Sequence, residues 1–275
     1  MAHVLLPTDL SDNALNAAIY AVRLFGEEGN KFTLLHVLAP SMSMEGADVS
    51  TELQLAEIAT EGLAAFSKRL SLGLAGLKPS ITTAIEHGIL STVVKHFHED
   101  EDPPAMVVMG TQGASGLQEV LIGSNTADVI KHSGLPVLAV PNACSYTSPR
   151  RILLAEDAGP IEKATLKPLL DIARWSQGEV TIVRVLEEGA SADTDENDSP
   201  YDVLLGAIPH THRYLHGDNV QATINSMADQ GDTDLIALVH RQRGIFDGFF
   251  HRSTSARMVM HTHVPMLVLQ QRAHH

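Results

Sequence analysis

The stretch AMVVMGTQGASGLQEVLIGS, residues 105–124, decides the fold of the first half of this chain. It opens with a short apolar run typical of a buried strand, continues through several glycines, and ends at Ser124, where a helical pattern begins. Open parallel α/β sheets bind ligands at the carboxyl ends of their strands, where glycines let the backbone approach an anion. The stretch therefore indicates an α/β fold with a ligand site, although a glycine-rich connection can also serve only to turn the chain.

The rest of the first half shows the same alternation of short aliphatic runs and helical patterns. Strands are predicted over residues 4–7, 32–38, 81–86, 105–109 and 137–140, and helices over residues 13–25, 51–74, 90–99 and 124–132. Asp12, Thr51 and Ser124 are the expected N-caps of three of these helices. Strands this short and apolar, separated by helices, imply a parallel sheet that is covered on both faces.

The second half repeats this order. The aliphatic runs 4–6, 34–38 and 106–108 recur as 152–154, 182–186 and 236–238, and the spacing from Ser124 to Pro136 recurs from Ser253 to Pro265. An acidic, Ser-rich stretch (187–200) and a shorter element near 201–208 replace the long helix of the first half. We predict two doubly wound parallel-sheet domains in tandem, residues 1–143 and 149–275, joined by a polar linker.

Composition limits the class of protein. A chain of 275 residues with 44% hydrophobic and 19% charged residues can form two packed domains. The net charge of −14 argues against nucleic-acid binding, yet backbone N–H groups and a cation can still hold one nucleotide. We expect no signal peptide and no membrane span, and the single cysteine, Cys144, fits a reducing, cytoplasmic compartment.

The glycine spacing resembles a known signature. Gly110, two residues, Gly113, nine residues and then Gly123-Ser124 is similar to the ATP-binding motif of the universal stress protein family. The similarity covers essentially the whole chain, including the opening Val-Leu-Leu-Pro-Thr-Asp and the closing Leu-Pro-Val-Leu-Ala-Val of the first half. It implies the adenine nucleotide alpha-hydrolase-like fold, and ATP accompanied by Mg or Mn that is bound mainly through the phosphates.

The resemblance also assigns roles to residues of the first half. The loop glycines and Ser124 would cradle the triphosphate, Asp9 would lie near the adenosine, and the backbone at Val37 would face the adenine. The residues that it places at the nucleotide are Pro7, Thr8, Asp9, Val37, Met109, Gly110, Gly113, Gly123, Ser124, Asn125 and Thr126.

Several of these residues have a purely structural alternative. Asp9 can cap the first helix, and Thr8 can close a local turn. The Val37 side chain belongs to the core whatever its backbone does. Asn125 and Thr126, in the first helical turn, can reach a phosphate or only solvent.

The matching loop of the second half, residues 240–253, has lost the glycines. His240 and Arg243 replace the first two glycines and Arg252 replaces the third, so side chains stand where close backbone approach is needed. Asp157 remains but lacks such a loop. The arginines, with Arg241, could hold another anion, but a solvated or salt-bridged loop is favoured, and we predict a degenerate domain with a structural or regulatory role.

Fifteen histidines raise the question of a metal site. His210, His212 and His216 are spaced so that they can share one face of a strand, and His261 and His263 form another close pair. Because no cysteine partner or His-Glu-x-x-His pattern accompanies them, no metal site is predicted. No catalytic residue is predicted either.

The favoured function is a nucleotide-dependent regulatory or binding module of the stress response, with an unidentified protein partner. The loop lacks the lysine of common NTPase loops and shows no obvious water-activating carboxylate, so fast hydrolysis is not expected. The alternatives are a slow ATPase or phosphotransfer protein, and a scaffold with a vestigial nucleotide site.

The last strand of each half, residues 137–140 and 266–269, would form an exposed sheet edge. In the resembled family, single-domain members dimerise by pairing these final strands antiparallel. We therefore expect the two halves to pair with each other as an internal pseudo-dimer, with a homodimer of whole chains as the alternative.

Overall fold

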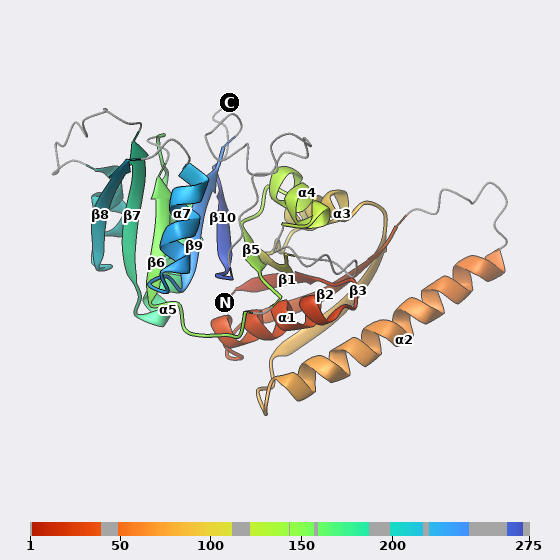
Figure 1. Cartoon of the computed structure of the whole chain (residues 1–275). Helices are drawn as coiled ribbons and strands as arrows, with labels where there is room; N and C mark the ends of the chain where they lie inside the picture. The colour runs from red at the N-terminus through yellow and green to blue at the C-terminus, as the bar shows by residue number, and fades with distance from the viewer. Residues whose placement is uncertain are drawn as a thin grey trace.

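A computed structural model describes residues 2–39, 49–111, 122–142, 144–156, 159–186, 199–216, 220–241 and 263–271. Within them lies one ten-stranded sheet with the strand order β3-β2-β1-β4-β5-β10-β9-β6-β7-β8. The strands of each half are parallel to one another, and helices cover the sheet (Figure 1). The prediction of tandem doubly wound α/β halves is confirmed.

The elements of the first half match the predicted ones to within two residues at each end. The strands are β1 (His3–Pro7), β2 (Lys31–Leu38), β3 (Ser80–His87), β4 (Met106–Gly110) and β5 (Val137–Val140). The helices are α1 (Asp12–Phe25), α2 (Val49–Gly73), α3 (Leu90–Glu99) and α4 (Ser124–His132).

Each expected N-cap residue lies inside the first turn of its helix, one to three residues after the capping position. Ser11, not Asp12, is the N-cap of α1, and its hydroxyl accepts a backbone N–H of the first turn at 3.2 Å. Thr51 lies inside the first turn of α2, and Ser124 is the first residue of α4, with Gly123 at the N-cap. Polar residues favour both the cap and the first turn, so composition alone does not separate the two positions.

The described residues of the second half repeat the order of elements up to the ninth strand, with a shorter second helix; residues 242–262, where the first half has α4, lie outside them. Its strands are β6 (Arg151–Glu156), β7 (Glu179–Leu186), β8 (His210–His216), β9 (Leu235–His240) and β10 (Met266–Gln270). Its helices are α5 (Lys163–Ser176), α6 (Pro200–Leu205) and α7 (Val220–Asp229). The short helix α6 stands in the chain where the first half has the long helix α2.

Apolar side chains are buried on both faces of the sheet. On one face Leu6 and Tyr20 belong to a core cluster that α1, α2, α5 and α6 share with the strands. On the other face Leu5, Val93 and Ile130 belong to a second cluster, to which α3, α4 and α7 contribute. Alternate residues of each strand enter opposite clusters, as the pleat requires.

The two halves meet where β5 and β10 pair antiparallel, with Leu138 directly opposite Leu267. Both leucine side chains are fully buried. The Gln270 side-chain amide donates to the carbonyl of Ile130 at 2.7 Å. One sheet and its covering helices therefore run through both halves.

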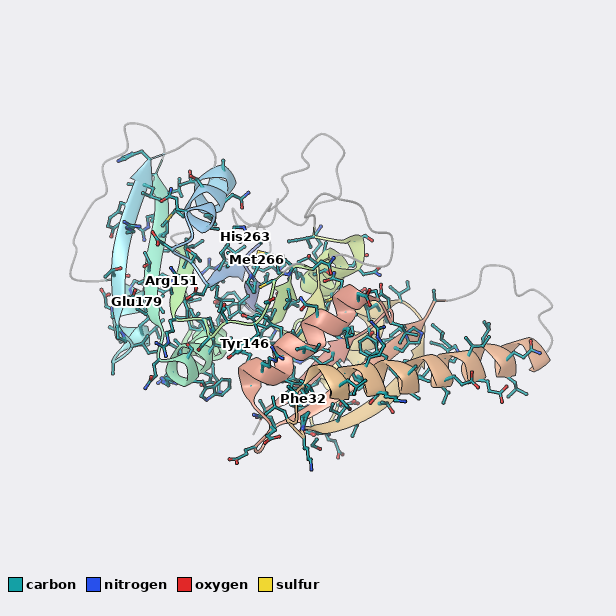
Figure 2. All side chains as sticks on the ribbon, turned by 60° about the horizontal axis from the view of Figure 1, so that its bottom comes forward. Phe32, Tyr146, Arg151, Glu179, His263 and Met266 are labelled. Atoms are coloured by element: carbon teal, nitrogen blue, oxygen red, sulfur yellow. The ribbon has the colours of Figure 1, made fainter. Side chains whose placement is uncertain are left out.

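The linker between β5 and β6 lies against α1. The Asn16 amide donates to the carbonyl oxygens of Pro141 and Cys144, at 3.2 and 2.9 Å. Tyr146, which is labelled in Figure 2, lies beside α1. Its ring packs edge-on against that of Tyr20, with ring centroids 5.2 Å apart. Burial raises the pKa of the Cys144 thiol to about 11, so this sulfur is protonated at neutral pH and a poor nucleophile.

Candidate functional site

A cavity of about 600 Å³ lies at the carboxyl ends of β1, β2 and β4, beside the start of α4. The strand order reverses between β1 and β4, so the cavity occupies the switch point at which doubly wound sheets bind ligands. Every predicted site residue that the structure describes lines it: Pro7, Thr8, Asp9, Val37, Met109, Gly110, Gly123, Ser124, Asn125 and Thr126. Gly113 lies outside the described residues.

A tight turn links the end of β1 to α1. The Thr8 hydroxyl accepts the N–H of Leu10 at 2.9 Å, and the Asp9 carboxylate accepts the N–H of Ser11 at 3.1 Å. Thr8 therefore closes a local turn, and Asp9 orders the residues before the helix without being its cap. Leu10 has φ of 68°, a conformation that costs a non-glycine residue about 1 kcal/mol or more. This turn leaves the Asp9 side chain exposed at the rim of the cavity.

Gly110, at the end of β4, is held from two sides. A Cβ atom at this position would lie only 2.5 Å from the side-chain nitrogen of the buried Asn13. The Thr126 hydroxyl donates to the Gly110 carbonyl oxygen at 2.9 Å. Gly110 is thus required by the packing of α1 against β4, independently of any ligand, and the buried Thr126 side chain anchors the strand end.

The start of α4 faces the cavity. The Gly123 N–H donates to the carbonyl of Thr111 at 2.5 Å, so these two residues lie side by side. Gly123 has φ −60° and ψ 155°, which any residue can adopt, and the first turn of α4 contains no acidic side chain. Ser124 and Asn125 are exposed there. The N–H groups of a first helical turn favour an anion at this place.

The end of β2 contributes His36 and Val37. The His36 Nδ1 atom lies 2.8 Å from the carbonyl oxygen of Thr8. A carbonyl only accepts, so Nδ1 carries the hydrogen and the Nε2 atom of the neutral ring is an acceptor. Val37 is half-buried, packs against the core and lines the cavity.

Sequence reasoning missed His36, which lines the same cavity together with Ala14, Ala39, Gly88, Ile89 and Leu90. In the sequence these residues have the pattern of ordinary strand, helix or turn residues. Only the parallel pairing of β1, β2 and β3 brings them beside the β1 turn.

The register of the second half corrects one alignment. β4 and β9 each pair with the first strand of their half, and these pairings align the two strands with each other. The resulting alignment differs by one residue from the one expected from the sequence. Val239, not His240, therefore stands where the first half has Gly110. In either alignment, a residue with a larger side chain stands at the position of the glycine. Outside the described residues lie Asp157, Arg243, Arg252 and the phenylalanines at 246, 249 and 250.

An ion pair with a buried carboxylate occupies the matching strand ends of the second half. Glu156 stands where the first half has Thr8, and Arg184 stands where it has His36. The Arg184 guanidinium donates to the Glu156 carboxylate, whose side chain is 3% exposed, and this hydrogen bond raises the pKa of Arg184. An ion pair therefore fills the strand ends that border the cavity in the first half.

Arg241, which follows β9, binds the main chain. Its guanidinium donates to the carbonyl oxygens of Pro160 and Gly159, at 2.7 and 3.3 Å. These contacts hold the connection that follows β6 against the end of β9. The remaining residues of the loop, 242–253, lie outside the described residues.

The fold and cavity define a tandem α/β protein with a ligand-sized cavity at the switch point of its first half. The chain belongs to the universal stress protein family, whose model matches residues 1–141 and again residues 149–270. None of the helices within the described ranges combines the length and apolar character needed to cross a bilayer.

Two named relatives match stretches of about half of the chain's length. A universal stress protein of Methanocaldococcus jannaschii is 31% identical over 140 residues, which are 50% of this chain and 80% of the relative. Universal stress protein G of Salmonella typhimurium is 29% identical over 139 residues, which are 50% of this chain and 96% of the relative. The crystal structure of an Archaeoglobus fulgidus universal stress protein covers 98% of this chain and 96% of its own, with 22% identity and a TM-score of 0.71. The fold of both halves together is therefore shared with a known protein.

Proposed function

We propose that the first half binds one ATP, together with Mg or Mn held mainly by the phosphates. Occupancy of this site would set the conformation or assembly of a cytoplasmic stress-response protein, with the second half in a structural role. The observation that supports the proposal is the single cavity that collects Asp9, Val37, Gly110, Gly123 and Ser124 from separate parts of the chain.

Each wall of the cavity suits a different part of the nucleotide. The start of α4 offers backbone N–H groups to phosphate oxygens, and the glycine at 123 leaves room for them. The exposed Asp9 carboxylate is an acceptor for ribose hydroxyls, and Val37 and Met109 offer apolar surface to a base.

The second half is proposed not to bind ATP. The buried Glu156 carboxylate and the Arg184 side chain occupy the ends of β6 and β7, and Val239 replaces the first loop glycine. A triphosphate would have to displace this ion pair, and the carboxylate left behind would face the phosphates.

Calorimetry of the full chain with ATP and Mg²⁺ tests the proposal, with an expected stoichiometry of one ATP per chain. Nucleotide extracted by denaturation after incubation should be intact ATP, since regulation by occupancy requires no cleavage. Conversion to ADP that is absent from a Gly113→Val variant would favour the slow ATPase alternative. Binding of two equivalents would reject the degenerate second half, and no binding would favour a scaffold with a vestigial site.

ATP binding should depend on a divalent cation. A triphosphate approaches a chain of net charge −14, and the first turn of α4 contributes no basic side chain to offset its charge. Mg²⁺ or Mn²⁺ bridging the phosphate oxygens supplies the missing positive charge. Titrations in Mg²⁺ and in EDTA should differ by about tenfold or more in ATP affinity; equal affinities would contradict this prediction.

A further inference from the structure

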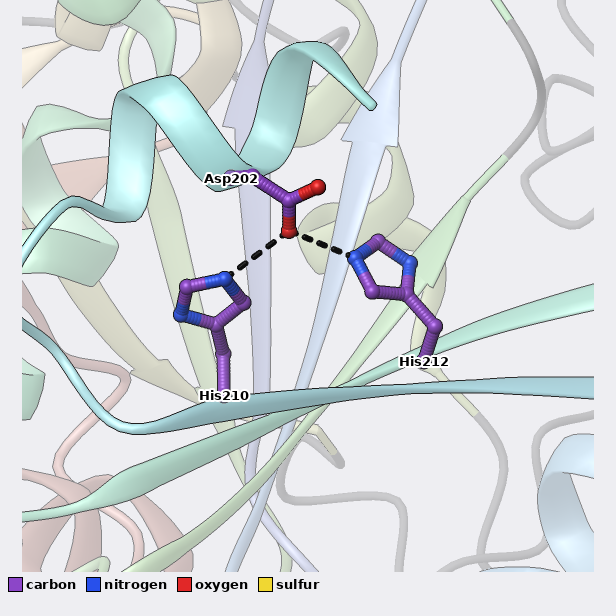
Figure 3. Close-up of side chains that lie close together, drawn as sticks. All are labelled: Asp202, His210 and His212. Atoms are coloured by element: carbon purple, nitrogen blue, oxygen red, sulfur yellow. Dashed lines mark hydrogen bonds and ion pairs between the residues drawn. The ribbon is translucent and has the colours of Figure 1, made fainter. Parts of the chain in front are cut away.

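Two histidines of β8 and one aspartate of α6 converge on one point in the second half (Figure 3). His210 and His212 are two residues apart on the strand and so project from the same face of the sheet. Asp202 reaches them from α6, which Tyr201 and Leu205 anchor in the core. The Asp202 Oδ1 atom lies 2.9 Å from His210 Nε2 and 2.8 Å from His212 Nε2.

The two ring nitrogens of His210 face different partners, one the main chain and the other the Asp202 carboxylate. Its Nδ1 atom lies 2.7 Å from the carbonyl oxygen of Ile208, which can only accept, so Nδ1 carries a hydrogen. In the neutral ring, the Nε2 atom then carries no hydrogen, and its lone pair faces the Asp202 carboxylate oxygen. Two acceptors at this distance need either a second proton on the ring or a metal ion between them. A ring nitrogen donating to a backbone carbonyl is also the usual support of a metal-bound histidine.

We propose that Asp202, His210 and His212 bind a first-row divalent transition-metal ion, with Zn²⁺ the best match. Two imidazole nitrogens and one carboxylate oxygen suit Zn²⁺, whereas Mg²⁺ and Ca²⁺ prefer oxygen ligands alone. Three protein ligands leave a fourth position for water.

The three ligand atoms lie near one another, and an ion can reach them from solvent. The three ligand atoms lie within 4.8 Å of one another. Tetrahedral Zn²⁺ with bonds of about 2.0–2.1 Å needs its ligand atoms about 3.3 Å apart. The side chains are partly exposed, between 18% and 34%, so an ion can enter from solvent.

The site is a property of the second half alone. The strand registers place Ile81 and Thr83 of β3 at the positions of His210 and His212. β8 is the edge strand of its half, and α6 is a single short helix. A metal ion that joins them would fix the edge of the sheet, independently of ATP in the other half.

The test uses the full chain, without an affinity tag and freed of metal by a chelator. Titration with Zn²⁺ should show one site that Asp202→Asn and His212→Ala each weaken by about a hundredfold or more. His216→Ala, on the same strand but outside the cluster, is the matched control and should bind like the wild type. Added Zn²⁺ should raise the Tm of the wild type and of the control, and not that of the two ligand variants.

Co²⁺ gives a second readout that does not depend on stability. It should produce the visible absorption of a tetrahedral site in the wild type, and Asp202→Asn should lose it. Equal Zn²⁺ affinity in the wild type and both ligand variants would overturn the proposal. So would a Co²⁺ spectrum that the variants leave unchanged, since the three side chains would then form only a hydrogen-bonded cluster. Circular dichroism of the metal-free variants confirms that they are folded.

Discussion

A Gly123→Val variant should lose ATP affinity by about a hundredfold or more while keeping its fold. With φ −60° and ψ 155°, the backbone at this position suits valine, so the substitution introduces no strain of its own. The added side chain stands where phosphate oxygens would approach the start of α4. Losing two charge-assisted hydrogen bonds of about 1.5–3 kcal/mol each corresponds to a hundredfold or larger loss. Calorimetry with ATP and Mg²⁺ measures the change.

Two further variants make this result specific. Arg252→Val changes the residue that the sequence aligns with Gly123 in the second half, and it should leave ATP affinity unchanged. Gly113→Val should act like Gly123→Val if the resemblance assigns the loop correctly. A substitution at Gly110 is a weaker test, because a Cβ there would displace Asn13 and disturb the packing of α1. Wild-type affinity in both the Gly113 and Gly123 variants would contradict the assignment.

The fold could be predicted because each strand and helix carries its own local signal. The run Val4-Leu5-Leu6 is too short and too apolar for anything but a buried strand, and its recurrence at residues 152–154 reveals the repeat. The predicted positions of the helix caps were wrong at the level of single residues. Ser11 and Asp12 have the same preference for a helix start, and only the backbone geometry separates them.

The candidate site could be predicted only where glycines and their spacing mark it. Gly110 and Gly123 have no strand or helix preference to explain them, so their spacing stood out in the sequence. His36 and the Glu156–Arg184 pair depend on which residues face each other across parallel strands. That register is set by packing between strands far apart in the chain, which local pattern does not reveal.

The cluster of Asp202, His210 and His212 shows the same limit. The alternation of the two histidines is visible in the sequence, and it correctly indicates one shared face of a strand. The carboxylate that joins them comes from α6, and nothing in the spacing indicates how this helix lies on β8. The expectation of no metal site rested on the absence of a cysteine partner and of a His-Glu-x-x-His pattern, whereas the proposed histidine–carboxylate set needs neither.

Lysine at both Leu138 and Leu267 should cost most or all of the stability of the chain. The two side chains face each other across the β5–β10 pair and are fully buried. An uncompensated buried charge costs about 3–5 kcal/mol, and two ammonium groups placed opposite each other repel as well. Typical domains are stable by only about 5–15 kcal/mol, so thermal melts should show a large fall in Tm or no folded state.

The molecular mass of the same variant separates the two ways in which the final strands can pair. If β5 and β10 pair within one chain, the double lysine variant should lose stability. Its mass in light scattering should equal that of the wild type, because no dimer dissociates. If whole chains pair through these strands, the variant should change from dimer to monomer while each half stays folded. The double methionine variant at the same positions conserves volume, costs less than about 1.5 kcal/mol per site, and should behave like the wild type in both measurements. A folded monomeric lysine variant derived from a dimeric wild type would therefore reject the internal pseudo-dimer, because a β5–β10 pair inside one chain has no second chain to release.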